Sequence, residues 1–529
     1  MGARNEGYAR ASGIPAEQRT AYQSRLASDA FKKRQRTVYV GANDGMLHAF
    51  NTGIYVDDGD DVFEPIDDFN NGNGVETFAY VPAAVHANLP ALAHPEYLDR
   101  HLYFVDGTPV AGDAWIGGAW KTVLVGSTGA GGRSYFALDI ENPAAMNASK
   151  VMWEFTHDEL GLAIGQATIA RTASNHWVAI FGNGYNSNSH RAQLFIVNLA
   201  NGTLLRKIDT GIGSAAQSNG MGSPQVVDFN LDGNADLVYA GDYRGNLWKI
   251  DLTNADPDKW AVTFGGKPLF TAKDGEGNTQ PITAQPTVRR HPSKGGLVVY
   301  FGTGKLMLVG DQGDLSEQAL YGIFDLCGSI VSDDCKTAGT NEDGTAKAQR
   351  VLKSDLLEQD IYEEDKAEFG TVEWDYRLIT QNALDPTKHR GFFITLLPPT
   401  DVAAGERAVG PASVAFSDRV IFTTILPNDD PCEQGADGWI IEIDPFSGGR
   451  TDYSVFDMNV DGAFNGLDQK GGADGTVVSG RRTPGGATPA ILHGTDRSYK
   501  CGTQAGAGQC IPNKPDPNLV NRQSWQQMH

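Results

Sequence analysis

Short apolar runs that end in glycine or another small residue recur along most of the chain. Each is followed by a polar turn and by a second strand-like run that closes on Asp or Asn. The clearest copies are Thr37–Gly53 and Leu237–Leu252. Repetition of one strand–turn–strand unit is typical of folds that stack similar sheets. We therefore predict an all-β fold.

The spacing of these units narrows the fold further. Four of the glycines that end a first run are Gly126, Gly182, Gly241 and Gly302. The steps between them are 56, 59 and 61 residues, room for about one four-stranded sheet and its loops, which is a β-propeller blade. We predict a modified β-propeller over residues 37–500, with seven blades favoured over six or eight. The longer gaps at 54–121 and 303–418 are expected to hold loop insertions or a degenerate blade. An open sandwich or two separate β domains are the alternatives, and the even spacing disfavours both.

Helical patterning is clearest near the start of the chain, at residues 15–36. Pro15 suits a first helical turn, Tyr22 begins a thin apolar stripe, and the basic end complements the helix dipole. We expect an N-terminal helical arm at residues 1–36 that packs on the main body. Residues 501–529 are expected to form a C-terminal tail.

An oxygen-rich loop lies between two apolar strand-like runs, with side-chain oxygens at positions 1, 3, 5 and 9 and Gly at position 6. The predicted ligands are the side chains of Asp228, Asn230, Asp232 and Asp236 and the backbone carbonyl of Asn234. Calcium accepts several oxygen ligands at flexible distances, and EF-hand loops use these positions. Position 12 is Tyr239 rather than Glu, so we predict an EF-hand-like calcium loop embedded in β structure. The alternative, an ordinary Asx turn, does not require three carboxylates that face one point.

A second candidate loop runs from Asp457 to Asp468. It has oxygen side chains at positions 1, 3, 5 and 9, Gly at position 6 and a carboxylate at position 12. Its ligand count exceeds that of the first loop, but its glycine-rich flanks are less strand-like. The sequence therefore leaves its occupancy by calcium open.

Composition limits the function classes. The net charge of −22 argues against a nucleic-acid partner, whose phosphates require a basic surface, and suits an exported cation-binding surface. No apolar run approaches the roughly 18 residues of a membrane span, so none is expected. The start of the chain lacks the pattern of a signal peptide, so we expect the targeting sequence to lie upstream.

The five cysteines form two close pairs and one single residue. They are Cys327 with Cys335, Cys501 with Cys510, and Cys432. Close pairs in loop-like sequence are consistent with local disulfides in an oxidising compartment, and unpaired thiols are the alternative. Nothing in the sequence names a partner for Cys432.

Signatures of enzymatic chemistry are missing from the sequence. It contains no Gly-x-Ser-x-Gly, no His-Glu-x-x-His and no phosphate loop that ends in Gly-Lys-Ser/Thr. We name no catalytic residue and do not expect an enzyme.

Two repeat copies, Tyr39–Asn51 and Asp236–Asp251, resemble the C-terminal domain of the PilY family, and the first loop runs directly into the second copy. The PilY family comprises type IV pilus biogenesis factors and pilus-tip adhesins. The resemblance covers about residues 37–500. It implies a modified propeller whose bound Ca²⁺ tunes pilus extension and retraction, twitching motility and surface attachment, with the calcium ligands on the five loop residues given above.

The same resemblance implies partners and a location. Type IV pilus components, either pilins or minor pilins, are the expected partners, with host or abiotic surfaces as further ones. The implied location is extracellular or pilus-associated after export through the periplasm. No Arg-Gly-Asp occurs in the sequence, so integrin-type adhesion is not assigned to it.

Two alternative functions remain. Tyr39–Phe50 is also similar to blades of quinoprotein dehydrogenases, propellers that hold pyrroloquinoline quinone over calcium. Those enzymes repeat a Trp-centred motif in nearly every blade, and the 9 Trp residues do not recur in that way. The other alternative is a structural propeller in which calcium only stabilises the folded form.

Overall fold

The computed structural model defines two compact units. It describes residues 5–53, 74–292, 296–307, 309–326, 350–400, 402–415, 418–427, 437–483, 490–493, 498–504 and 507–512. The first unit consists of the described residues up to Tyr243 together with Lys249–Lys267. The second consists of Arg244–Trp248 and the described residues from Pro268 onward.

The predicted N-terminal helix is present but broken. It forms α1 (Ala16–Ala27) and α2 (Asp29–Lys32), where the sequence pattern predicted one helical segment over 15–36. Ser28 takes an extended conformation between them, and its hydroxyl accepts a hydrogen bond from the Phe31 N–H at 3.3 Å. The serine thereby ends one helix and caps the next, which is a favoured role for this residue.

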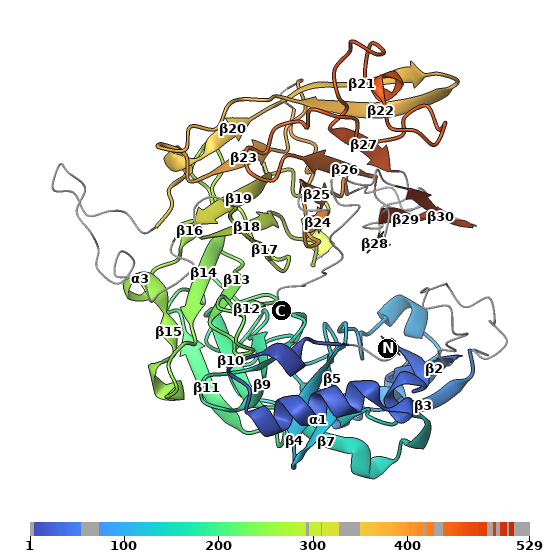
Figure 1. The fold of residues 1–529 in the computed structure, drawn as a ribbon, viewed down its shortest axis with the longest axis vertical. Helices are drawn as coiled ribbons and strands as arrows, with labels where there is room; N and C mark the ends of the chain where they lie inside the picture. The colour runs from blue at the N-terminus through green and yellow to red at the C-terminus, as the bar shows by residue number, and fades with distance from the viewer. Residues whose placement is uncertain are drawn as a thin grey trace. The chain divides into compact units, whose positions relative to one another are not determined.

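The first unit contains three complete antiparallel sheets (Figure 1). The first is β1 (Arg36–Gly41), β2 (Leu47–Gly53) and β3 (Glu76–Tyr80). The second is β4 (Val110–Ile116), β5 (Ala119–Ser127), β6 (Tyr135–Asp139) and β7 (Val151–Phe155). The third is β8 (Thr168–Arg171), β9 (Trp177–Gly182), β10 (Gln193–Asn198) and β11 (Leu204–Asp209). In each sheet, strands that follow one another in the chain are hydrogen-bonded neighbours.

A fourth sheet follows, in the order β12-β13-β14-β15, with β16 also paired to β14. Its strands are β12 (Gln225–Val227), β13 (Leu237–Gly241), β14 (Asn246–Asp251), β15 (Ala261–Val262) and β16 (Phe270–Thr271). The predicted strand pairs are found as neighbours here and in the earlier sheets. Tyr39, for example, lies opposite Ala49 in the first hairpin.

The second unit departs from the four-stranded pattern. One sheet has the order β17 (Thr287–Arg290), β18 (Leu297–Gly302), β19 (Ala319–Asp325), β23 (Gly391–Thr395) and β20 (Leu357–Gln359). The next has the order β21 (Ile361–Phe369), β22 (Val372–Ile379), β27 (Gly480–Thr483), β26 (Gly438–Ile443), β25 (Arg419–Thr423) and β24 (Ser413–Ala415). The predicted insertion at 303–418 therefore adds strands to both sheets. One of them, β20, pairs with β23 in parallel.

The last sheet consists of β28 (Ala490–His493), β29 (Ser498–Gln504) and β30 (Ala507–Pro512). Its hairpin continues past residue 500, into the segment expected to form a tail. The backbones of Cys501 and Cys510 lie opposite each other in its antiparallel register. The disulfide between them stays a prediction, and Cys327, Cys335 and Cys432 lie outside the described residues.

Short helices precede the first strand or occupy connections between strands. They are η1 (Tyr8–Arg10), η3 (Ala83–Val85), η4 (Leu89–Ala93), η5 (Tyr97–Arg100), η6 (Pro143–Ala145), η7 (Ala148–Lys150), η8 (Pro257–Lys259), α3 (Thr263–Gly266), η9 (Val309–Asp311), η10 (Lys353–Asp355) and η11 (Gly466–Asp468). The described strands form seven sheets. The number of blades stays a prediction.

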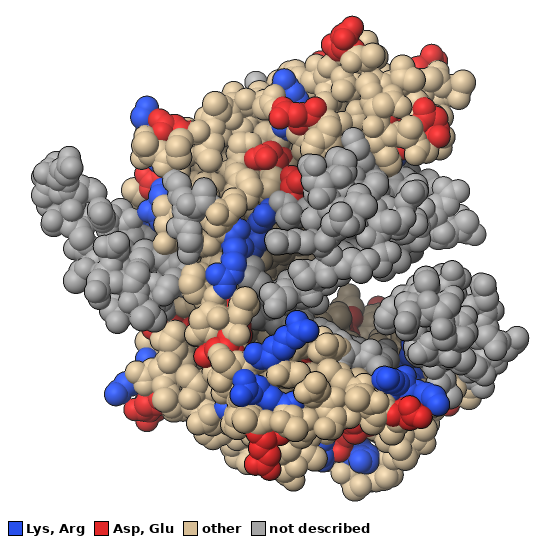
Figure 2. Space-filling model, viewed as in Figure 1, with Lys and Arg blue, Asp and Glu red and all other residues tan. Residues whose placement is uncertain are grey.

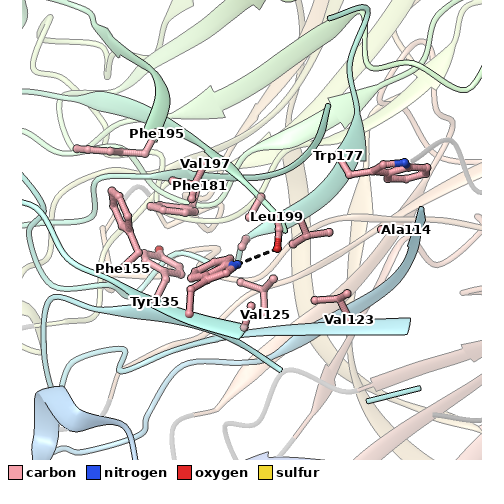
Figure 3. Packing of buried hydrophobic residues seen from close by; sticks show 14 of the residues in the cluster. Ala114, Val123, Val125, Tyr135, Phe155, Trp177, Phe181, Phe195, Val197 and Leu199 are labelled. Carbon is pink, nitrogen blue, oxygen red and sulfur yellow. Dashed lines mark hydrogen bonds between the residues drawn. The ribbon is translucent and has the colours of Figure 1, made fainter. Parts of the chain in front are cut away.

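Aromatic residues fill the core of the first unit (Figure 3). Tyr135 and Phe181 stack with ring centroids 3.8 Å apart, and Phe195 stacks on the same Phe181 at 6.0 Å. The indole N–H of Trp153 donates to the carbonyl of Leu199 at 2.8 Å, which satisfies a polar group that would otherwise be buried at a cost. Adjacent sheets thus bury their inward faces against each other.

Charged side chains are spread over the surface in small groups among uncharged residues on the face that Figure 2 shows. No helix among the described residues combines the length and the apolar character that crossing a membrane requires.

Candidate metal centre

The first predicted loop, Asp228–Asp236, connects two neighbouring antiparallel strands. Val227, the last residue of β12, pairs with Leu237, the first residue of β13. The Asp236 N–H donates to the Val227 carbonyl at 2.9 Å. Strand pairing therefore brings the first and ninth positions of the loop together, with β structure on both sides as predicted.

Two left-handed residues produce the sharp turn inside this loop. Leu231 has φ 61° and Gly233 has φ 93°. Glycine adopts this conformation without the penalty that a side chain imposes. The position-6 glycine therefore has the conformational role that the sequence pattern indicated.

The polar side chains of the loop accept hydrogen bonds from its own backbone. Asp228 accepts from the N–H groups of Asp232 and Gly233 at 3.1 and 2.6 Å. Asn230 Oδ1 accepts from the Asp232 N–H at 2.8 Å, and Asp232 Oδ1 accepts from the Asn234 N–H at 2.7 Å. These bonds fix the side chains at positions 1, 3 and 5 on the inside of the turn.

Asp236 closes the loop from its other end. Its Oδ2 accepts hydrogen bonds from the N–H groups of Phe229 at 2.8 Å and Asn230 at 3.2 Å. The carboxylate of position 9 is thereby held against positions 2 and 3.

The loop concentrates negative charge in a partly buried place. Burial raises the pKa of Asp236 to about 6, and the charges of Asp228 and Asp232 add to that rise. Burial also raises the pKa of Asp228, with the charge of Asp232 contributing. Within the described residues, none of these three carboxylates forms an ion pair. The nearby positive group is Arg171, whose pKa burial lowers while the charge of Asp232 acts in the opposite direction. A bound cation would supply further counter-charge for the remaining carboxylates.

The donor set fits calcium in its chemistry, because it consists of carboxylate, amide and carbonyl oxygens. Asp232 Oδ2 and Asp236 Oδ1 accept no backbone hydrogen bond from the described part of the chain. No three His, Cys, Asp or Glu side chains of the described residues form a group that could hold a metal ion. The carboxylates are instead bonded to the loop's own amides, and two of the five predicted ligands are asparagines.

Asn234 lies where a backbone ligand is expected. Its side chain is buried, and its Oδ1 accepts a hydrogen bond from the Arg171 guanidinium. The side chain is therefore engaged away from the other loop oxygens, which leaves the backbone carbonyl as the group that this residue can offer.

Sequence reasoning missed two residues that support the loop. Arg171 is the last residue of β8. Thr172, which follows it, forms a parallel bridge with Ala235 of the loop. The Gly13 N–H donates to the Asp232 carbonyl at 2.7 Å. Both contacts come from segments far from the loop in the chain, so no local spacing could have indicated them.

The second loop has the same backbone turn. Val460 has φ 59° and Gly462 has φ 81°, at positions 4 and 6. Asp457 accepts hydrogen bonds from the N–H groups of Asp461 at 3.1 Å and Gly462 at 2.9 Å. Positions 1 to 6 of the two loops are therefore alike.

The two loops close differently. In the second loop Asp468, at position 12, accepts from the N–H groups of Met458 at 2.8 Å and Asn459 at 3.3 Å, as Asp236 does from position 9 of the first loop. Asn465, at position 9, instead accepts from the Leu467 N–H at 2.8 Å and caps η11. In the second loop it is therefore the position-12 carboxylate, and not the position-9 amide, that is bonded to the start of the loop.

Each loop has a buried arginine near one of its carboxylates, Arg171 near Asp232 and Arg481 near Asp457. Burial lowers the pKa of Arg481 to about 10, while the charge of Asp457 acts in the opposite direction. The positive group acts on position 1 of the second loop and on position 5 of the first loop. Occupancy of the second loop by calcium stays a prediction.

Comparison with known proteins places the chain in a family. The family model of the PilY1 beta-propeller domain matches residues 8–373. Type IV pilus biogenesis factor PilY1 of Pseudomonas aeruginosa is 34% identical over 94% of this chain and 42% of its own length. A PilY1 homolog of Xylella fastidiosa is 36% identical over 84% of this chain and 28% of its own length. The chain thus spans less than half the length of these curated relatives.

The fold comparison agrees. The crystal structure of the P. aeruginosa PilY1 C-terminal domain matches with a TM-score of 0.76 at 31% identity, over 98% of this chain and 99% of that one. The predicted all-β, modified β-propeller fold and the predicted family are thereby confirmed. The relatives are named as pilus biogenesis factors and not as enzymes. The chain belongs to the PilY1 family of type IV pilus biogenesis factors and carries the β-propeller domain of that family.

Proposed function

We propose that this chain is a calcium-binding, non-enzymatic propeller domain that regulates type IV pilus extension and retraction, and with them twitching motility and surface attachment. One observation carries the calcium part: the carboxylates of the loop Asp228–Asp236 lie near enough to raise the pKa values of Asp228 and Asp236, and none of them forms an ion pair among the described residues. Family membership supports the pilus part, since the relatives are named as type IV pilus biogenesis factors.

The loop suits a local clamp on one sheet. It joins β12 directly to β13, and the Asp236 carbonyl accepts a hydrogen bond from the Leu252 N–H at 2.9 Å, just beyond β14. A cation held by the loop would fix the connection between strands that form one sheet. Its binding would stabilise the folded form by mass action.

The proposed partners rest on family membership. Pilins or minor pilins are the proposed protein partners, with host or abiotic surfaces as further ones. The proposed location is pilus-associated and extracellular, after export through the periplasm. Extracellular calcium modules commonly have Kd values of about 0.1 to 1 mM, and we expect an affinity of this order.

Isothermal titration with calcium tests the metal site. Asp232→Asn keeps the size of the central side chain but removes its charge, so we expect calcium affinity to fall about tenfold or more. Asp385→Asn is the matched control, because Asp385 accepts the Thr387 N–H at 2.9 Å in an ordinary turn outside both loops. Equal calcium affinity in Asp232→Asn and in the unsubstituted chain would overturn the assignment of the first loop.

A pilus assay separates regulation from simple stabilisation. In bacteria that produce the full-length protein with Asp232→Asn, regulation predicts altered twitching at unchanged protein abundance. If calcium only stabilises the fold, twitching falls only as far as protein abundance falls.

Reduction of a dye with added quinone and an alcohol would contradict the non-enzymatic proposal.

A further inference from the structure

We propose that the N-terminal segment Ala11–Ile14 is part of the calcium site, and that calcium binding to the first loop and docking of this segment strengthen each other. This inference rests on the proposed function, in which the loop binds calcium. It adds a regulatory contact: the state of the loop is transmitted to the arm that precedes the propeller strands.

The first contact is a backbone hydrogen bond to the central predicted ligand. The Gly13 N–H donates to the Asp232 carbonyl at 2.7 Å. Any change in the backbone at Asp232 therefore reaches the N-terminal segment without an intervening side chain.

The second contact is a buried arginine that holds both partners. Arg171 donates from one guanidinium nitrogen to the Gly13 carbonyl at 3.0 Å and to Asn234 Oδ1. Its other terminal nitrogen donates to Asn175 Oδ1 at 2.6 Å. Arg171 is only 3% exposed, so its planar fork is fixed in place. Arg171 is therefore a positioning residue for Asn234, whose backbone carbonyl is a proposed ligand.

The third contact is close packing that two glycines permit. A Cβ on Gly13 would lie 2.4 Å from Asn234 Nδ2 and 2.9 Å from the Asp232 carbonyl oxygen. A Cβ on Gly233 would lie 2.6 Å from the Cβ of Ala11. The segment and the loop thus approach more closely than any other residue at these two positions would allow.

The rest of the arm is anchored independently on the first unit. Arg25 of α1 forms ion pairs with Asp113 at 2.8 Å and Glu141 at 2.7 Å. The Tyr22 hydroxyl donates to the same Asp113 at 2.9 Å. Ile14, 1% exposed, belongs to the buried cluster that also contains Tyr22. The N-terminal segment therefore spans from a fixed helix to the loop.

Thermodynamic linkage turns these contacts into a coupling. A segment that docks only on the ordered loop stabilises that loop, and an ion that orders the loop favours docking. The two effects must be equal in size, because coupling between two binding events is reciprocal. Couplings of this kind typically change affinity by about 5- to 150-fold.

Gly13→Ala tests the coupling directly. The Gly13 backbone is not left-handed, so alanine adds only a methyl group that collides with the loop. We expect its calcium affinity, measured by isothermal titration, to fall about fivefold or more. In the unsubstituted chain, calcium should slow hydrogen exchange at the Gly13 amide by a similar factor, and in Gly13→Ala this protection should be lost. Gln23→Ala, on the exposed face of α1, is the matched control and should leave both measurements unchanged.

A variant of Arg171 and a comparison with Asp232→Asn separate failure of this inference from failure of the proposed function. Arg171→Lys keeps the positive charge near Asp232 but loses the planar fork that bonds to both Gly13 and Asn234, and it decides the question if circular dichroism shows that Gly13→Ala does not fold. If Asp232→Asn loses calcium binding but Gly13→Ala and Arg171→Lys bind calcium like the unsubstituted chain, the inference is overturned while the proposed function stands. If Asp232→Asn binds calcium normally, the proposed function fails instead.

Discussion

Asp236 is the most strongly perturbed side chain of the first loop. Two backbone N–H groups stabilise its carboxylate, yet burial and the charges of Asp228 and Asp232 outweigh them and raise its pKa to about 6. A carboxylate whose charged form is disfavoured in the folded chain gains from a bound cation. The chemistry of this residue thus favours metal binding near neutral pH.

This perturbation predicts a pH dependence of calcium binding. Between about pH 4 and pH 6 the calcium-free folded state holds a proton on Asp236 that the unfolded state has lost, so stability of the calcium-free chain falls as pH rises through that window. Calcium must displace this proton. Below about pH 6 we expect the apparent calcium affinity to fall by up to tenfold per pH unit, for one displaced proton. Titrations across this range check it, and an affinity that stays constant would contradict it.

The sequence predicted the oxygen donors but not their support. The spacing from Asp228 to Asp236 is a local property, so the turn and its position-6 glycine could be inferred from the chain alone. Arg171 and Gly13 reach the loop through the packing of distant segments. Such contacts depend on tertiary structure, and a single sequence carries no local signal for them.

The two loops show how flanking elements decide loop closure. The first loop connects paired strands, so its position 9 is brought beside its start by the β12–β13 register. The second loop lies in the long connection between β26 and β27 and adjoins neither strand. There the helix η11 places Asp468 against the N–H groups near the start of the loop. Similar residue spacing therefore gives different ligand positions when the surrounding elements differ.

The arm depends on one buried ion-pair group, and this predicts a large mutational effect. Arg25 is 10% exposed and pairs with Asp113, which is 3% exposed. Removal of one partner leaves the other charge buried, which typically costs about 3 to 5 kcal/mol. We expect Arg25→Ala to lower the free energy of unfolding, measured by urea denaturation, by about 3 kcal/mol.

An exposed ion pair in the same arm provides the control. Lys33 and Asp29 lie 3.4 Å apart, with 68% and 82% of their side chains exposed. Surface pairs of this kind contribute at most about 1 kcal/mol. Lys33→Ala should therefore change stability little, and an effect as large as that of Arg25→Ala would show that burial does not control this arm.

At the level of elements, the sequence predicted local hairpins well and long-range pairings poorly. Alternating apolar runs indicated the pairs β1–β2, β9–β10 and β18–β19, whose strands are close in the chain. The parallel pairing of β20 with β23 joins strands across an insertion, and no periodicity in either strand indicates it. The helix break at Ser28 was also missed, because the helical pattern continues through it.

At the scale of the molecule, each of the two compact units contains one candidate loop. Asp228–Asp236 lies in the first unit and Asp457–Asp468 in the second. Calcium bound to one loop would stabilise the unit that contains it. Occupancy can therefore be assigned to a unit by measuring local stability along the chain.

Removal of calcium should accordingly weaken the first unit. At a calcium concentration of about 100 Kd, the bound ion stabilises the folded form by about 2.7 kcal/mol. We expect chelation to increase hydrogen exchange in β12 and β13, and Asp232→Asn to show the same exchange with or without calcium. A second ion would be assigned to the second loop if calcium still slows hydrogen exchange in β26 and β27 of Asp232→Asn but no longer does so in Asp457→Asn. Chelation that leaves β12 and β13 unchanged would exclude the first loop as the site through which calcium acts on the fold.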